Sequence, residues 1–183
     1  DILIATNILG AARSGRLTKL QKKIPLKVCA DNPISLKEYS KAAEAANLPL
    51  DVLIECDTGE KRAGVEKPSE ALSLIKSIIA DKWLKFTGLL YYPPLHGWEN
   101  TQLFHDELTK MLDELNLKAK IISTGRTPHF ANIGKLKGAT EHRAGTCIFN
   151  DMMMVEDGFA QTSDCAFRVF TSVVSRANDN RGI

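Results

Sequence analysis

The chain has 183 residues, of which 44% are hydrophobic and 25% charged, and its formal net charge is +2. This composition is typical of a globular protein with one well-cored domain or slightly more. The near balance of charge, with no long block of one sign, argues against a nucleic-acid or membrane partner, so we expect small-molecule ligands. No apolar run approaches the ~20 residues that cross a bilayer, and we expect a cytoplasmic protein.

Short apolar runs alternate with segments of helical periodicity along the first two thirds of the chain. The expected strands cover residues 1–6, 25–31, 50–56, 84–92 and 119–125. The expected helices cover residues 8–24, 35–48, 68–81 and 99–117. Ser35, with Glu38 three residues later, predicts a capping box for the second helix, and Pro68 suits the first turn of the third. Strands separated by helices predict a parallel sheet, either a barrel or an open doubly wound sheet.

The end of the chain has a different pattern. From Asp164 the sequence DCAFRVFTSVVSR alternates with a period of two and has no helix after it, which predicts strands. We therefore expect an α/β domain over residues 1–162 and the start of an all-β domain over residues 163–183. A full (βα)8 barrel needs ~250 residues, so the first part is expected to hold most of a barrel.

Common catalytic signatures are missing from the sequence, including those of nucleotide-binding loops, zinc proteases and serine hydrolases. The four histidines have no metal-binding spacing, and we expect them on the surface or in loops. No cysteine pair has the C-x-x-C spacing, so the four cysteines are expected to be reduced and buried. These cysteines are Cys29, Cys56, Cys147 and Cys165.

Polar residues follow the predicted strands, at the ends that face the ligand in parallel α/β proteins. They are Asn7, Asp31, Asn32, Glu55, Asp57, Arg62, Tyr91, Tyr92, Ser123, Thr124, Gly125 and Thr127. Most of them also suit ordinary turns and helix caps. Arg62 and Tyr92 are the exceptions, because turns have no particular need for these side chains.

Two segments could bind an anion. In STGRTPHF, residues 123–130, hydroxyl groups and a glycine-freed backbone would form a phosphate cradle, although a plain loop would look similar. In HRAGTCIFND, residues 142–151, Gly145 would let the N–H groups of Thr146 and Cys147 approach an anion, with Arg143 reaching it from the side. A β-bulge with a surface arginine is the alternative for the second segment.

These segments together resemble the fold-type III pyridoxal-phosphate enzymes, which include alanine racemase, D-serine dehydratase and D-threonine aldolase. The resemblance rests on VCADN, VLIECDTGEKRAGV, GLLYY, STGRTP, EHRAGTCIFND and DCAFRVFTSVVSR, in this order. It implies a partial (βα)8 TIM barrel of the alanine-racemase type, followed by the start of an all-β domain.

The resemblance also implies a role for each candidate residue toward pyridoxal 5'-phosphate. Arg62 would hydrogen-bond the phenolic oxygen of the cofactor, Glu55 would orient Arg62 through a charge-assisted pair, and Tyr92 would pack its ring on the pyridine. Arg143 would face the pyridine nitrogen. The phosphate would be held by Ser123, Gly125, Thr127, Gly145, Thr146 and Cys147.

The sequence departs from this family in several places. Relatives usually have tyrosine at the position of Cys147, and they fill with glycine the loop in which Arg126 lies here. The lysine that bonds the cofactor would lie before Asp1, and the ligands of a divalent metal would lie after Ile183. We therefore expect this chain alone to be inactive, and to be poorly stable because an open barrel leaves unpaired strand edges.

The resemblance implies a lyase that cleaves D-β-hydroxy amino acids to glycine and an aldehyde, using pyridoxal 5'-phosphate and a metal. D-Serine dehydratase activity is the near alternative, and an amino-acid racemase is more remote. Two other classes stay open: a non-catalytic protein that binds pyridoxal phosphate, and a phosphate-binding barrel unrelated to this cofactor. A homodimer stays open as the oligomeric state.

Overall fold

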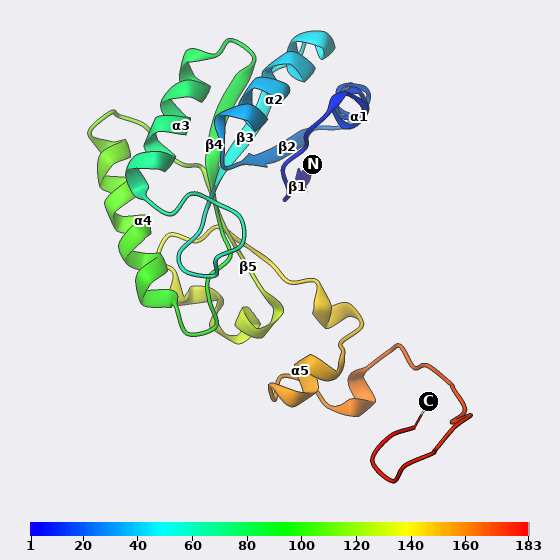
Figure 1. Cartoon of the computed structure of the whole chain (residues 1–183). Helices are drawn as coiled ribbons and strands as arrows, with labels where there is room; N and C mark the ends of the chain where they lie inside the picture. The colour runs from blue at the N-terminus through cyan, green and yellow to red at the C-terminus, as the bar shows by residue number, and fades with distance from the viewer. Residues whose placement is uncertain (183) are drawn as a thin grey trace. The chain divides into compact units, whose positions relative to one another are not determined.

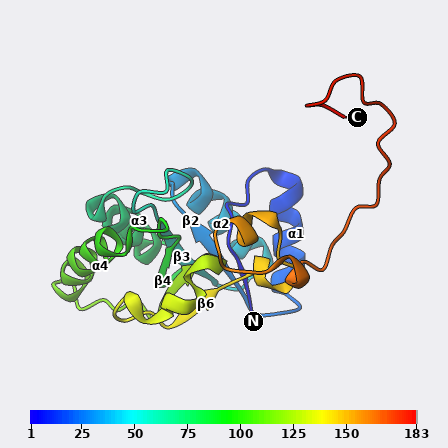
Figure 2. The same cartoon turned by 90° about the horizontal axis from the view of Figure 1, so that it is seen from below.

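The structure, a computed structural model, describes residues 1–182. Six strands form one parallel sheet and follow the order of the chain from β1 to β6 (Figures 1 and 2). The strands are β1 (Ile2–Ile4), β2 (Leu26–Ala30), β3 (Leu50–Cys56), β4 (Leu84–Tyr91), β5 (Ile121–Gly125) and β6 (Glu141–Arg143). This sequential parallel order is that of a half-barrel, which confirms the predicted fold class.

Helices connect the first five strands, as parallel neighbours require. They are α1 (Ala11–Gln21), α2 (Pro33–Ala46), α3 (Pro68–Ala80) and α4 (Trp98–Asp113). Neighbouring helices in the chain pack against one another along the sheet (Figure 1). The connection from β5 to β6 instead contains the 3-10 segment η1 (Thr127–Lys135). The sequence therefore predicted these four helices and the first five strands correctly.

The start of α2 differs from the predicted capping box. Asn32 is the N-cap residue, because its side-chain oxygen accepts the N–H of Ser35 at 2.9 Å and Pro33 occupies the first turn. Ser35 lies inside the helix and is fully buried. At α3, the predicted placement of Pro68 in the first turn is confirmed.

The two faces of the sheet carry different side chains, because successive residues of a strand point to opposite faces. In β3, Leu50, Val52 and Ile54 belong to the main core, which the residues of the surrounding helices complete. Leu53 belongs instead to a small second cluster with Cys29 and Leu90 from the neighbouring strands. This second cluster lies on the inner face of the half-barrel, below the polar residues at the strand ends.

Strand β6 was not predicted. It pairs with β5 in parallel, with Ser123 opposite Glu141 and Gly125 opposite Arg143. The sequence EHR is short and polar, so it carries no apolar alternation by which a strand could be recognised. The pairing nevertheless fixes Arg143 beside the end of β5.

The chain divides into two compact units, Asp1–Ala144 and Gly145–Ile183. The second contains η2 (Thr146–Ile148), α5 (Met152–Glu156) and η3 (Thr162–Asp164). The strand expected from Asp164 does not form: residues 165–176 have no ladder partner, and Phe170 is 96% exposed. The expected start of an all-β domain at residue 163 stays a prediction.

The expectations for cysteines and histidines were wrong in part. Cys29 and Cys56 are buried, but Cys147 is exposed and Cys165 half-buried. His105 and His129 are buried, contrary to a surface position. Both have partners inside the fold: His105 Nδ1 lies 3.2 Å from the hydroxyl of Tyr91, and His129 Nε2 lies 3.2 Å from the carbonyl of Pro93. Within residues 1–182, no helix has the length and apolar character needed to cross a membrane.

Candidate functional site

A cavity of about 250 Å³ lies at the carboxyl ends of the strands in the first unit. Its walls come from the segments after β1 and β3, from the end of β4 and from β6. The lining residues are Ala5, Thr6, Asn7, Glu55, Cys56, Asp57, Glu60, Arg62, Ala63, Tyr92 and Arg143. Six residues singled out from the sequence therefore meet around one space: Asn7, Glu55, Asp57, Arg62, Tyr92 and Arg143. Arg62 and Arg143 are 81 positions apart in the chain (143 − 62).

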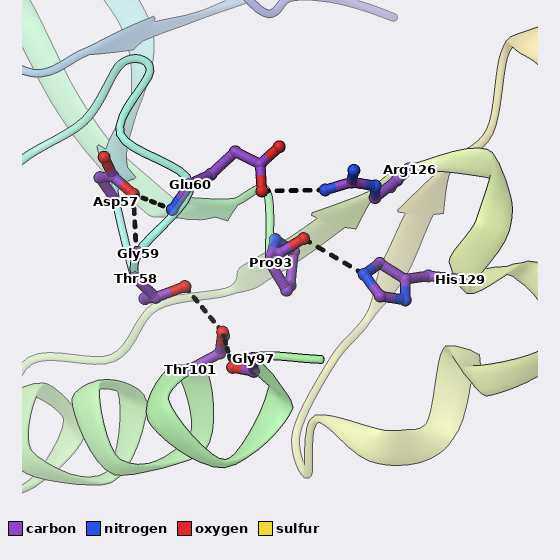
Figure 3. Close-up of polar contacts among 9 residues, drawn as sticks. All are labelled: Asp57, Thr58, Gly59, Glu60, Pro93, Gly97, Thr101, Arg126 and His129. Carbon is purple, nitrogen blue, oxygen red and sulfur yellow. Dashed lines mark hydrogen bonds and ion pairs between the residues drawn. The ribbon is translucent and has the colours of Figure 1, made fainter. Parts of the chain in front are cut away.

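Arg62 lies on a loop that folds back onto the end of β3. The backbone of Val65 exchanges hydrogen bonds with Glu55 and Asp57, at 3.0 and 2.9 Å. The carboxylate of Asp57 accepts the N–H groups of Gly59 and Glu60 at 2.9 and 2.8 Å, which closes a tight turn (Figure 3). The loop is thus held at both its start and its end.

The guanidinium of Arg62 lies over the ring of Tyr92, with Cζ 4.8 Å from the ring centroid. This is a cation–π contact, and it keeps the exposed Arg62 side chain beside the cavity. The ring of Tyr92 therefore packs against a cation of the protein itself. The role expected for Tyr92 against a cofactor ring stays a prediction.

Hydrogen bonds to β4 and β5 hold the side chain of Arg143 in place. Its Nε donates to Ser123 Oγ at 3.0 Å and its Nη2 donates to the carbonyl of Tyr91 at 2.7 Å. Gly125 makes room for it, because a Cβ at that position would lie 3.1 Å from Arg143 Nη2 and 3.2 Å from the Tyr92 ring. Burial lowers the pKa of Arg143, while the carboxylate of Glu55 raises it.

Glu55 does not form the expected pair with Arg62. Among the ion pairs of residues 1–182, none joins these two side chains; Glu55 Oε2 accepts a hydrogen bond from Cys29 Sγ at 3.5 Å. Burial raises the pKa of the Glu55 carboxyl, although the Cys29 thiol and the charges of Arg143 and Arg62 lower it. The arginines therefore act on Glu55 through space, without direct contact.

This raised pKa predicts a pH dependence of stability. A folded state that holds the Glu55 proton more tightly loses stability as the pH rises from the unfolded pKa, near 4.5, through the higher folded pKa. Glu55→Gln, which keeps the shape but removes the titration, should flatten that part of the stability curve. Urea unfolding of both proteins at several pH values between 4 and 8 would check it; parallel curves would contradict it.

The predicted phosphate-binding residues are divided between the two units. Ser123 is fully buried and Thr127 nearly so, and neither lines the cavity. Ser123 instead supports Arg143. Gly145, Thr146 and Cys147 belong to the second unit, at the start of η2. The phosphate-binding roles of all these residues stay predictions.

Three supporting residues had no assigned role in the sequence analysis. Asp31 accepts Asn7 Nδ2 at 2.8 Å and the N–H of Gly64 at 3.0 Å, so it joins the ends of β1 and β2 to the Arg62 loop. Cys29 could have been found from strand alternation, because it lies two residues before Asp31 on the same face. Glu60 gave no signal, because its partner Arg126 is 66 residues away.

The half-barrel with a small polar cavity at its strand ends is an α/β domain of the kind that binds small ligands at this edge of the sheet. The chain matches the alanine racemase N-terminal domain over residues 3–152 and belongs to this family. It is 33% identical over 97 residues to a D-threonine aldolase of Arthrobacter sp, covering 53% of this chain and 25% of that protein. It is 25% identical over 195 residues to a D-threo-3-hydroxyaspartate dehydratase of Delftia sp. (strain HT23), covering 98% and 50% of the two.

The fold agrees with solved structures of such proteins. The crystal structure of D-threonine aldolase from Filomicrobium marinum superposes with a TM-score of 0.80 at 23% identity, covering 96% of this chain and 52% of that one. At this identity the likeness concerns the fold alone. The chain spans about half or less of the length of these proteins.

The chemistry of the cavity fits pyridoxal 5'-phosphate, the cofactor of the resembling enzymes. This molecule is a flat anionic ring, and the cavity presents two guanidinium groups and an aromatic side chain to one small space. Of the three carboxyl side chains in the lining, Asp57 accepts two backbone N–H groups and Glu60 pairs with Arg126. Burial raises the pKa of the third, Glu55. Among the described residues, no group of three or more His, Cys, Asp or Glu side chains is placed to hold a metal ion.

Proposed function

We propose that the protein is a pyridoxal-phosphate-dependent lyase acting on D-β-hydroxy amino acids. The observation that carries this proposal is the meeting of Arg62, Tyr92 and Arg143 around one cavity at the strand ends. Family membership and the similarity to aldolases and dehydratases named for such substrates support it.

In this proposal each residue of the cavity has a defined task. Arg62 donates a charge-assisted hydrogen bond to the phenolic oxygen of the cofactor, and Arg143 faces its ring nitrogen. Tyr92 limits the movement of Arg62 and closes one side of the cavity. When bound, the cofactor supplies an electron sink for the bonds at Cα of an amino acid.

The phosphate would be held by the loop after β5. No lysine of the described chain lines the cavity. Under this proposal, the lysine that bonds the cofactor and the ligands of the divalent metal lie outside residues 1–183.

The test is a product analysis of the protein expressed from its complete coding sequence. With pyridoxal 5'-phosphate and Mn²⁺, we expect D-threonine to give glycine and acetaldehyde, with no reaction of L-threonine. The same assay without metal would show whether the reaction needs one. Cofactor binding without any turnover of D-amino acids would favour a non-catalytic binding protein instead.

Dehydration is the second candidate, because the match to the Delftia dehydratase covers 98% of this chain. A dehydratase would release ammonia and a 2-oxo acid from D-threo-3-hydroxyaspartate or D-serine, and no glycine. A racemase would interconvert D- and L-alanine. One panel of substrates with chiral amino-acid analysis therefore separates the three reactions.

A further inference from the structure

An ion pair joins the loop after β3 to the loop after β5. Arg126 Nη1 lies 2.9 Å from Glu60 Oε2, and both side chains are about three-quarters buried, with 24% and 23% exposed (Figure 3). Glu60 lines the cavity and lies two residues before Arg62. The pair therefore links the loop that presents Arg62 to the loop after β5.

Arg126 has a backbone conformation that suits glycine better than arginine. Its φ is +93°, in a region that residues with side chains rarely adopt. The surroundings impose this conformation: the N–H of Arg126 donates to the carbonyl of Arg143 at 3.2 Å. Its own carbonyl accepts His142 Nε2 and the N–H of His129, both at 3.1 Å. An arginine here is strained, and its side chain contributes contacts that glycine lacks.

Those contacts converge on Tyr92. The Cζ atom of Arg126 lies 5.5 Å from the centroid of the Tyr92 ring, and that of Arg62 lies 4.8 Å from it. Two cations close to one ring would repel each other if both were uncompensated. The carboxylate of Glu60 compensates the charge of Arg126 and so reduces this repulsion.

We infer that Arg126 is a positioning residue: paired with Glu60 beside Tyr92, it holds the 57–65 loop so that Arg62 faces the cavity. This inference rests on the proposed function for its ligand, which is the phenolic oxygen of a pyridoxine-type ring.

The first test measures hydrogen exchange of the loop amides without any ligand, in the protein expressed from its complete coding sequence. The amides of Gly59, Glu60 and Gly64 are hydrogen-bonded to Asp57 or Asp31 and should exchange slowly. Arg126→Gly should raise their hydrogen exchange roughly tenfold through local opening. The melting temperature should not fall, because glycine relieves the backbone strain. A residue with a merely structural role would lower it.

The second test measures binding of 4-deoxypyridoxine 5'-phosphate, which keeps the ring oxygen and phosphate but cannot bond a lysine. By calorimetry, Arg126→Gly and Glu60→Gln should each weaken its affinity about 3- to 10-fold, and the double variant should be no worse than either single one. The exchanged pair Glu60→Arg with Arg126→Glu should recover part of the affinity. Lys85→Gln is the control, because it breaks an ion pair with Asp51 at the opposite end of β3.

The outcomes separate this inference from the proposed function. If the unaltered protein does not bind the analogue, the proposed function fails. The hydrogen-exchange rates of the loop amides then decide alone whether the Glu60–Arg126 pair holds the 57–65 loop. If it binds and the Arg126→Gly protein binds equally well, the inference is overturned. Unchanged exchange in the 57–65 loop would overturn it too.

Discussion

Arg62→Ala is expected to weaken the binding of pyridoxal 5'-phosphate about 10- to 150-fold. The substitution removes a charge-assisted hydrogen bond, worth roughly 1.5 to 3 kcal/mol, from the ring oxygen of the cofactor. It should barely change the free energy of unfolding, since Arg62 is exposed and forms no ion pair among residues 1–182. Equilibrium titration of the apoprotein, followed by absorbance, would measure the loss.

Two further variants make the Arg62 result specific. Arg62→Lys keeps the charge but loses the planar fork of donors, so it should recover only part of the affinity. Arg16→Ala removes an exposed arginine from α1, away from the cavity, and should leave the affinity unchanged. Equal affinities of the Arg62→Ala and unaltered proteins would reject the assigned role of Arg62.

The strands and helices of the half-barrel could be predicted because local patterns determine them. In LDVLIEC, Leu50, Val52 and Ile54 give one apolar face for the helices to cover, and Leu53 points to the barrel interior. The same runs end at polar residues, so the sequence also located the edge of the sheet where Glu55, Arg62 and Tyr92 lie. Because the carboxyl ends of parallel strands lie at one edge of the sheet, these residues could be grouped without knowing where their side chains point.

The remaining features depend on contacts between distant segments. Strand β6 forms because β5 offers a free edge, and nothing in EHR signals a strand. Ser123 is buried and accepts a hydrogen bond from Arg143, a contact that the sequence did not indicate. Glu55 was expected beside Arg62 and instead meets the thiol of Cys29, which comes from the neighbouring strand. The partners in each of these contacts are far apart in the sequence, so local patterns could not predict them.

Gly64→Ala should damage both stability and ligand binding. Gly64 has φ +116°, and a Cβ there would lie 2.5 Å from the backbone nitrogen of Asp57 and 2.7 Å from the carbonyl carbon of Cys56. Both neighbours are backbone atoms at the end of β3, so they cannot turn aside. We expect a loss of about 2 to 4 kcal/mol in the free energy of unfolding, measured with urea.

The effect on binding follows from the position of Gly64 two residues after Arg62. A shift of Gly64 would break the hydrogen bond from its N–H to Asp31, which holds the loop at 3.0 Å. Arg62 would then leave its place over Tyr92, and the affinity for the cofactor should fall at least about tenfold, as for a lost charge-assisted bond. This loss should persist at temperatures where the variant is fully folded.

Gly15→Ala provides the matched comparison for Gly64→Ala. Gly15 lies inside α1, where an added Cβ would have nothing within 4 Å, so alanine should stabilise the protein by up to about 1 kcal/mol. The same glycine-to-alanine substitution would then raise the free energy of unfolding at position 15 and lower it at position 64. If Gly64→Ala were as harmless as Gly15→Ala, the 57–65 loop would be free to move, and it could not hold Arg62 in the cavity.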